Sequence, residues 1–242
     1  LMNEVLIIIP TYNESENIIK IIESIFSFYQ EINVLIVDDN SPDGTSHKVK
    51  KVISKFNNKL HIITRKSKMG IGTAYLSGFQ WAIQKKYKYV ISMDADFSHN
   101  PSDIRRLYEA CNLEKNDICI GSRYVRGFSV VNWPIQRIIL SYFASIYVRL
   151  VTFMNIKDPT SGFVCYSVNC LRELNLKKIE FNGYAFQIEM KFKLFLKKVI
   201  MKEIPIIFTD RKYGKSKLDS SIIGEAFFGV ISMKIKSFFS KE

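Results

Sequence analysis

The sequence predicts an α/β protein in which helices flank a mostly parallel sheet. Short, nearly continuous apolar runs, typical of buried strands, occupy residues 5–9, 34–37, 60–64 and 89–93. Segments with helical apolar spacing separate these runs, at residues 17–28, 46–56 and 73–85. Strands that alternate with helices favour parallel pairing, because each helix carries the chain back to the same end of the sheet.

The rest of the chain continues this alternation less regularly. Further strands are expected at residues 117–121, 164–167, 199–205 and 206–208, and further helices at 103–111, 135–152, 183–196 and 222–239. Pro134 suits the start of the longest of these helices. We expect two units, an α/β domain over residues 1–217 and an amphipathic C-terminal tail over residues 218–242.

The composition indicates a sizeable core and an anionic partner. Apolar residues make up 47% of the 242 residues, and 35 lysines and arginines against 23 acids give a net charge of +12. This excess favours a nucleic acid, an anionic bilayer or a phosphorylated substrate. The four cysteines show no zinc-binding spacing, so we expect free thiols in a reducing compartment.

Membrane contact is predicted at a surface and not through a spanning helix. No stretch reaches the roughly 18 apolar residues that a span needs, and no signal-peptide pattern is present, so we expect a cytoplasmic protein. In the tail, residues 222–239 place phenylalanines and isoleucines near helical spacing, with lysines around them. Such a helix lies on a bilayer surface, or packs against the protein core or a partner subunit.

Two carboxylates follow the fourth predicted strand. Asp94 and Asp96 are two residues apart, with Ser98 just beyond them. Strand side chains alternate, so this spacing puts both carboxylates on one side of the strand end. Converging acidic oxygens suit a hard divalent cation, Mg²⁺ or Mn²⁺. The alternative is a solvated turn in which aspartate acts as a turn former.

Polar loops also follow the second and third strands. Asp38, Asp39 and Asp43 lie where ligands bind in open parallel sheets, and their carboxylates suit a base or a ribose hydroxyl. A helix cap at Asp43 or Thr45 is the competing interpretation. Residues 65–72 combine cations with two glycines, which suits a phosphate but matches neither a dinucleotide fingerprint nor a P-loop.

Two basic features lie in the second half of the chain. Arg137 and Ser141 are four residues apart and share one face of the helix at 135–152, which suits the anionic headgroup of a lipid. Alternatively, Arg137 extends to water from an ordinary amphipathic helix. The loop at 211–217 holds four cations and one glycine. It is either a solvated run or a cover that neutralises a departing pyrophosphate.

The order of these motifs resembles a known enzyme family. The segments PTYNE at 10–14, DDNSPDGT at 38–45 and DAD at 94–96 resemble family 2 glycosyltransferases of the GT-A fold. The segments KxGxGTAY at 68–75, GSRY at 121–124, NWP at 132–134, TSGF at 160–163 and RxxGxSK at 211–217 resemble the dolichol-phosphate (polyprenol-phosphate) mannose synthases. The resemblance covers the chain from about residue 5 to residue 217 and leaves out the tail.

The resemblance implies GDP-mannose as the donor and a polyprenyl phosphate as the acceptor. The nucleoside would contact Pro10, Tyr12, Glu14, Asp38 and Asp39. The donor diphosphate and its metal ion, Mg²⁺ or Mn²⁺, would lie at Asp94, Asp96 and Ser98; some relatives have glutamine where this chain has Ser98. The phosphates would be covered by Arg211 and Lys217. The acceptor phosphate would be bound by Arg123, Arg137 and Ser141.

The implied reaction is a single in-line displacement with inversion at the anomeric carbon. A phosphate monoester has a second pKa of about 6, so the acceptor is ionised at neutral pH and needs no strong base. The metal and Arg211 would stabilise the GDP leaving group, with Asp94 and Asp96 as the other catalytic residues. One alternative is the same fold with UDP-glucose or UDP-N-acetylglucosamine and undecaprenyl phosphate. The other is a non-catalytic nucleotide or nucleic-acid binding module, although no nucleic-acid motif is present.

Overall fold

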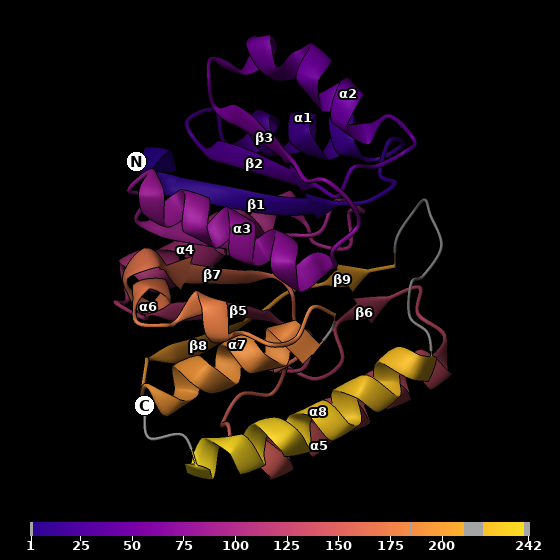
Figure 1. Cartoon of the computed structure of the whole chain (residues 1–242), viewed down its shortest axis with the longest axis vertical. Helices are drawn as coiled ribbons and strands as arrows, with labels where there is room; N and C mark the ends of the chain where they lie inside the picture. Colours follow the sequence, from indigo (N-terminus) through magenta and orange to yellow (C-terminus); the bar gives the residue numbers. More distant parts are fainter. Residues whose placement is uncertain (1, 184, 211–219, 240–242) are drawn as a thin grey trace.

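The apolar runs of the first half form parallel strands of one sheet. The computed structural model describes residues 2–183, 185–210 and 220–239. These first strands are β1 (Val5–Thr11), β2 (Asn33–Asp38), β3 (Leu60–Thr64) and β4 (Tyr89–Ser92). Within the described residues they belong to a seven-stranded sheet with the order β3-β2-β1-β4-β7-β5-β8, which crosses the middle of the molecule (Figure 1). The predicted α/β class and the mostly parallel sheet are therefore confirmed.

The second half of the chain adds the remaining strands. These are β5 (Ile118–Ser122), β7 (Val164–Ser167) and β8 (Met201–Pro205). β7 lies antiparallel between β4 and β5, while β5 and β8 are parallel. A separate parallel pair joins β6 (Val130–Val131) to β9 (Phe208–Thr209). β6 was not expected, because two residues are too few to show a periodic pattern.

Helices cover both faces of the sheet, as the alternation of side chains along β1 requires. Val5, Ile7 and Ile9 pack in one core cluster with the helices of one face, and Leu6 and Ile8 pack in the other. One face carries α1 (Ile18–Phe28), α2 (Thr45–Val52) and α4 (Ile104–Asn112). The other carries α3 (Ile71–Gln84), α6 (Val168–Arg172) and α7 (Ala185–Leu196). Short 3₁₀ helices are η1 (Met2–Glu4), η2 (Ile53–Phe56), η3 (Pro101–Asp103) and η4 (Leu176–Lys178).

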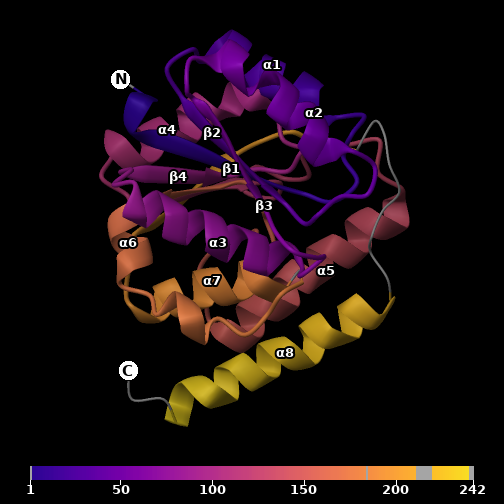
Figure 2. The same ribbon diagram turned by 45° about the horizontal axis from the view of Figure 1, so that its top comes forward.

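Two long helices form an outer layer over α7. They are α5 (Ile135–Thr152) and α8 (Ser220–Phe239), and α8 packs against both α5 and α7 (Figures 1 and 2). The Tyr147 hydroxyl donates to the Phe227 carbonyl oxygen at 2.8 Å, and Val230 and Met233 enter the main core. The inner face of the last helix therefore packs against the protein. A boundary after residue 217 stays a prediction.

The described helices and the cysteines have two further properties that bear on the sequence analysis. No helix within the described part of the chain is both long enough and apolar enough to cross a membrane. The four cysteines, Cys111, Cys119, Cys165 and Cys170, are free and buried. Burial raises the pKa of the Cys170 thiol to about 12, which makes it a poor nucleophile at neutral pH.

Candidate active site

The polar loops predicted at the strand ends meet at one edge of the sheet. From β1 the chain moves outward to β2 and β3, and then returns to β4 on the other side of β1. A sheet whose strand order reverses in this way has a crevice beyond the carboxyl ends of the strands on either side. The loops after β1, β2, β4 and β5 carry Tyr12, Asp39, Asp94 and Arg123, respectively.

The turn after β4 is held by hydrogen bonds among its own residues. Phe97 adopts a left-handed φ of 63°, which folds the chain back toward the strand. Asp96 accepts hydrogen bonds from the Ser98 backbone N–H, at 3.1 Å, and from the Ser98 hydroxyl. The Asp94 backbone N–H donates to His99 Nδ1 at 3.1 Å. Asp96, Ser98 and His99 are buried, so this turn is not the solvated turn of the alternative interpretation.

His99 is the buried support of this turn. Its ring stacks on Phe163, with centroids 4.7 Å apart, and meets the edge of Phe208. Burial lowers the pKa of His99 to about 4, although the charge of Asp96 opposes this shift. The imidazole is therefore neutral at physiological pH. Because Nδ1 accepts the Asp94 N–H, the ring proton is assigned to Nε2.

Asp94 and Asp96 fit a cation that arrives with a phosphate ligand. Both line the same cavity, and the Asp94 side chain is 34% exposed. Within the described residues, no group of three or more His, Cys, Asp or Glu side chains forms a closed metal cage. Mg²⁺ is commonly bound by one or two carboxylates together with substrate phosphates and water. The donor set therefore suits Mg²⁺ or Mn²⁺ bound jointly with a diphosphate.

One cavity joins the carboxylates to the predicted acceptor-binding residues. It has a volume of about 460 Å³ and lies between the strand ends and helices α5, α7 and α8. Its polar lining includes all of the following predicted residues: Asp94, Asp96, Ser98, Arg123, Arg137 and Ser141. Its apolar lining comes largely from α5 and α8, with Leu140, Phe143 and Val230 among the contributors. Charged and apolar side chains thus line one space.

Arg123 is anchored by a buried carboxylate. Its Nε and Nη2 donate to the two oxygens of Asp158, at 2.7 and 2.6 Å, and Nη2 also donates to Thr160 Oγ1 at 2.7 Å. Burial opposes ionisation of Asp158, but the facing guanidinium outweighs it and keeps the pKa of Asp158 below its usual value. Trp133 and Phe208 lie with their rings 5.6 Å from the guanidinium. Arg123 is therefore held rigidly at the cavity wall.

Arg137 and Ser141 also face the cavity. The Arg137 guanidinium lies 4.0 Å from the centre of the Trp133 ring, and Nη1 donates to Asp210 at 2.8 Å. Ser141 Oγ is 2.7 Å from the hydroxyl of Tyr124. The alternative in which Arg137 simply extends to water is therefore wrong, because the side chain bends inward over Trp133.

The predicted nucleoside residues lie at the ends of β1 and β2 and in the loops that follow these strands. Pro10 is in β1 itself, and Lys68 Nζ lies 4.7 Å from the centre of the Tyr12 ring. Glu14 accepts from the Asn17 side chain at 3.0 Å, and its backbone N–H donates to Thr45 Oγ1. The Glu14–Thr45 bond joins the loops after β1 and β2, and the Lys68–Tyr12 contact joins the loops after β1 and β3.

Asp38, Asp39 and Asp43 all organise loops. Asp38 is fully buried and accepts hydrogen bonds from the Thr11 hydroxyl, at 2.8 Å, and from Ser41. Asp39 forms an ion pair with Arg65 and accepts backbone N–H groups of the loop before α3. Asp43 accepts from the N–H of Thr45, the first residue of α2. Arg65, one of the cations that the sequence suggested for a phosphate, therefore forms an ion pair with Asp39 in this structure.

Three residues of the site region were given no role by sequence reasoning. Asp158 precedes the TSGF segment and anchors Arg123; Gln187 lines the cavity; and Lys191 is fully buried one turn further along α7. Lys191 Nζ donates to the carbonyl oxygens of Ser161 and Gln187, at 2.7 and 3.1 Å. Burial lowers the pKa of Lys191 to about 7. The sequence feature that could have drawn attention to Lys191 is its position between Met190 and Phe192 in an otherwise apolar helix.

Two predicted residues lie outside the described part of the chain. These are Arg211 and Lys217, which were expected to cover the donor phosphates. They remain predictions.

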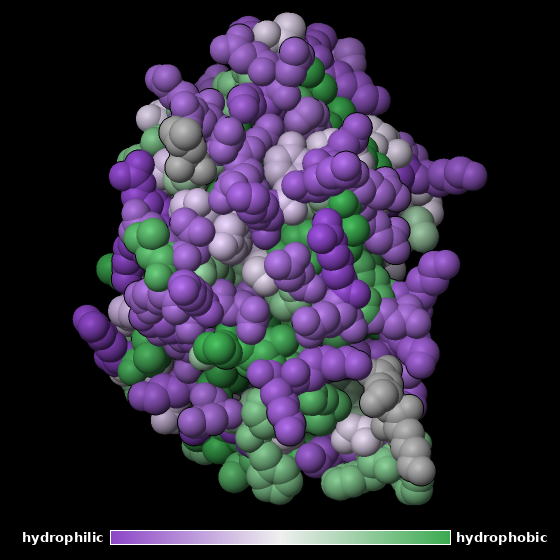
Figure 3. Space-filling model, turned by 90° about the vertical axis from the view of Figure 1, so that its left-hand side faces the viewer, coloured by the Kyte–Doolittle hydropathy of each residue, from purple (hydrophilic) through white to green (hydrophobic). Residues whose placement is uncertain are grey.

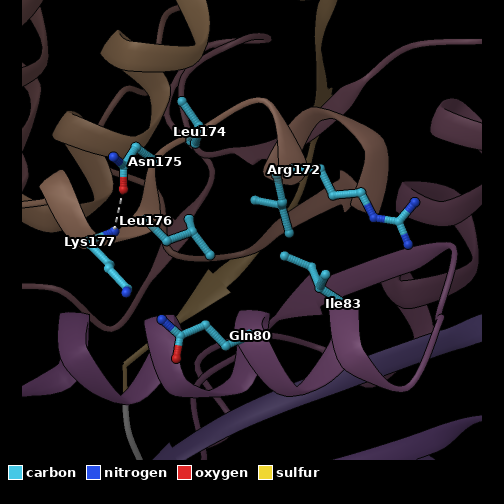
Figure 4. Close-up of a pocket in the computed structure, with 8 residues that line it drawn as sticks. Gln80, Ile83, Arg172, Leu174, Asn175, Leu176 and Lys177 are labelled. Carbon is cyan, nitrogen blue, oxygen red and sulfur yellow. Dashed lines mark hydrogen bonds between the residues drawn. The ribbon is translucent and has the colours of Figure 1, made fainter.

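A second depression lies away from the carboxylates. It measures about 300 Å³ and is formed where α3 faces the segment that follows β7 (Figure 4). Its lining includes Gln80, Ile83, Arg172, Leu174, Leu176 and Lys177. It contains no carboxylate and none of the predicted site residues, so the catalytic arrangement belongs to the larger cavity.

The fold and the paired carboxylates define a GT-A glycosyltransferase. The chain belongs to glycosyl transferase family 2, whose family model matches residues 6–174. It is 38% identical to the polyprenol monophosphomannose synthase of Mycolicibacterium smegmatis over 96% of this chain and 87% of that protein. It is 39% identical to the undecaprenyl-phosphate mannosyltransferase of Micrococcus luteus over 93% of this chain and 92% of that protein.

Other matches are more distant or cover less of the relative. The dolichol-phosphate mannosyltransferase of Pyrococcus furiosus is 37% identical over 92% of this chain, and the matched region spans 61% of that protein. The glucosyl-3-phosphoglycerate synthase of Mycobacterium tuberculosis, solved with Mn²⁺ and UDP, superposes with a TM-score of 0.68. That match covers 98% of this chain and 81% of the other at 15% identity, so it shows a shared fold.

Proposed function

We propose that the protein transfers mannose from GDP-mannose to a polyprenyl phosphate, with inversion and with Mg²⁺ or Mn²⁺. The observation that carries this proposal is the single cavity lined by paired carboxylates, by two arginines and by apolar side chains of α5 and α8. The mannosyltransferase names of the relatives support the choice of sugar and acceptor. Membership of a glycosyltransferase family favours catalysis over a non-catalytic binding module.

The donor would occupy the strand-end side of the cavity. Asp94 and Asp96 would hold the metal, which supplies positive charge to the departing diphosphate. The nucleoside would extend over β1 to Tyr12, Glu14 and Asp39, whose loops are tied together. Pro10 and Asp38 would support these loops from the sheet. Arg211 and Lys217 would close over the phosphates.

The acceptor phosphate would lie between Arg123, Arg137 and Ser141. Arg123 is oriented by Asp158, and its Nη1 has no hydrogen-bond partner among the described residues, which leaves it available to an anion. Arg137 approaches from α5 and is oriented by Trp133. Two guanidinium groups offset the repulsion between the acceptor phosphate and the donor diphosphate. The acceptor oxygen is then held facing the anomeric carbon as an ionised nucleophile.

The apolar end of the cavity suits the first isoprene units of the acceptor. Leu140, Phe143 and Ala144 line it from α5, and Phe227 and Val230 line it from α8. Each methylene that leaves water here contributes about 0.8 kcal/mol. A soluble phosphate ester without a lipid chain would leave this apolar wall uncovered.

The outer face of α5 suits a membrane surface. Its polar side chains Arg137, Ser141 and Ser145 face the protein, whereas Ile135 and Phe153 at its two ends are 73% and 72% exposed. Other exposed apolar residues on α5 and α8 include Ile139, Phe143, Leu150, Phe228, Ile235 and Phe238. Apolar side chains gather at the lower end of the molecule in Figure 3, the end where Figure 1 shows α5 and α8. We propose that this face rests on the cytoplasmic surface of a membrane.

The test is a transfer assay with competing donors. Purified protein is incubated with a short-chain polyprenyl phosphate and with GDP-mannose, UDP-glucose or UDP-N-acetylglucosamine, in Mg²⁺, Mn²⁺ or EDTA. We expect mannosyl transfer that depends on the metal. Transfer from a UDP-sugar alone would overturn the donor assignment, and salt-sensitive nucleic-acid binding without any transfer would overturn the catalytic assignment.

A further inference from the structure

Gln187 lines the cavity and has a buried amide oxygen without a partner among the described residues. The residue is only 8% exposed, and its Oε1 is buried without a hydrogen-bond partner among the described residues. It lines the same cavity as Asp94, Asp96 and Arg123. A buried polar atom without a partner is costly, so it needs a reason such as a ligand that completes it.

Room for about one methyl group lies between Gly162 and the amide nitrogen of Gln187. A β-carbon placed on Gly162 would have Gln187 Nε2 at 3.7 Å and His99 Cε1 at 3.8 Å as its nearest contacts. His99, Gly162 and Gln187 therefore surround a small recess, which we call the Gln187 recess.

The walls of the Gln187 recess are rigid. Ser92 Oγ donates to the Gly162 carbonyl oxygen at 2.7 Å, and Lys191 Nζ bonds the carbonyl oxygens of Ser161 and Gln187. These bonds hold the loop and the helix at a constant separation. A ligand in the recess would meet a preformed polar surface, which lowers the ordering cost of binding.

The chemistry of the amide selects the kind of ligand. Nε2, the amide atom nearest Gly162, donates hydrogen bonds, and Oε1 accepts them. An ionised phosphate can pair only with Nε2, whereas a sugar hydroxyl both donates and accepts and can pair with either atom of the amide. The recess also lies in the cavity that joins the carboxylates to Arg123, where the transferred sugar must pass.

We propose that Gln187 binds a hydroxyl group of the hexose that is transferred, and that it determines which hexose is accepted. This inference rests on the proposed transferase function and extends it to sugar selection. Removing one hydrogen-bond partner from a buried site costs about 1–3 kcal/mol, which corresponds to roughly 5- to 150-fold in kcat/KM. Hydroxyl recognition of this kind separates sugars that differ at a single carbon.

The experiment combines a change in the protein with a change in the sugar. kcat/KM is measured for GDP-mannose and for its 2-, 3-, 4- and 6-deoxy analogues, with the wild type, Gln187→Leu and the control Gln80→Leu. Gln80 is an exposed glutamine on α3 and lines only the second depression. We expect Gln187→Leu to lose about 10- to 100-fold on GDP-mannose. For one deoxy analogue, kcat/KM in Gln187→Leu should equal the value of that variant with GDP-mannose, because the hydroxyl that Gln187 recognises is already without its partner. Gln80→Leu should give wild-type kcat/KM with every donor.

Other outcomes would overturn the proposal. They are unchanged kcat/KM in Gln187→Leu, additive losses with all four analogues, or a loss that a higher Mn²⁺ concentration restores, which would make Gln187 a metal ligand. Absence of transfer by the wild type would instead refute the proposed function itself, so the two failures are distinguishable.

Gly162→Ala provides a second variant for the case in which Gln187→Leu does not fold. Its methyl group has room in the protein, because the nearest atoms lie at ordinary contact distances, but it enters the Gln187 recess. We expect about a tenfold loss with GDP-mannose, and a smaller loss with the analogue that lacks the recognised hydroxyl. Equal losses with all donors would contradict the proposal.

Discussion

Replacement of Lys191 by methionine should stabilise the protein at low pH. Burial lowers the pKa of Lys191 from 10.5 to about 7 in the folded state, against the opposing effect of Asp158 and Glu203 and with help from Arg123. Between these pH values the unfolded chain holds a proton that the folded chain has released, so stability rises with pH. Each pKa unit corresponds to about 1.4 kcal/mol. Charged Lys191 therefore costs the folded state up to roughly 5 kcal/mol below pH 7.

The substitution also removes two hydrogen bonds. Lys191→Met leaves the carbonyl oxygens of Ser161 and Gln187 without their donor, at a cost of about 1–3 kcal/mol. The variant should therefore be about 2–4 kcal/mol more stable than the wild type at pH 6. The difference in stability between the variant and the wild type should fall by about 3 kcal/mol between pH 7 and pH 9.5. The reason is that Lys191 of the folded wild type loses its proton in this range and no longer carries a buried charge.

Urea denaturation of the wild type and the variant at pH 6, 7.5 and 9 provides the test. The control is Lys51→Met, at an exposed lysine of α2, for which we expect a change of less than about 0.5 kcal/mol at each pH. A Lys191→Met variant that is less stable than the wild type at pH 6 would refute the reasoning. So would a stability difference that stays constant with pH.

Three further outcomes test the site and the membrane face. Asp96→Asn should lower metal-dependent transfer by about 100-fold or more, and wild-type activity that persists in EDTA would contradict the metal assignment. Arg137→Ala should raise KM for the polyprenyl phosphate by about tenfold or more with little change for GDP-mannose; equal losses for both would count against it as an acceptor-phosphate ligand. Phe143→Asp should weaken binding to anionic lipid vesicles by roughly 10- to 100-fold, as measured by co-sedimentation. The matched control is Phe28→Asp, at an exposed phenylalanine of α1, and an equal effect of both variants would exclude α5 as the docking face.

The sequence alone determined most of the secondary structure and the location of the carboxylates. Strands β1 to β4 are nearly continuous apolar runs, and this pattern depends only on neighbours along the chain. Asp94 and Asp96 could be placed at a strand end for the same reason. The bounds of β3, β7 and α5 agree with the expected ranges, whereas the five-residue α6 and the two-residue β6 are too short to leave a periodic signal.

Tertiary structure alone decided how the polar side chains are used. Asp38 and Asp39 looked alike in sequence, yet one is tied to Thr11 and Ser41 and the other to Arg65. The bond between Arg123 and Asp158 joins residues 35 positions apart. No local pattern encodes such a pair, because each residue alone resembles an ordinary surface charge.

The orientation of α5 and the burial of Gln187 and Lys191 were also decided by tertiary structure and not by a local sequence pattern. Helical spacing predicted that Arg137 and Ser141 share a face of α5, but not that this polar face turns inward while the apolar face is exposed. Which face of a helix is buried depends on what the rest of the chain packs against it. Burial is a property of the folded whole, and it is burial that lowers the pKa of Lys191 and leaves the Gln187 amide facing the cavity.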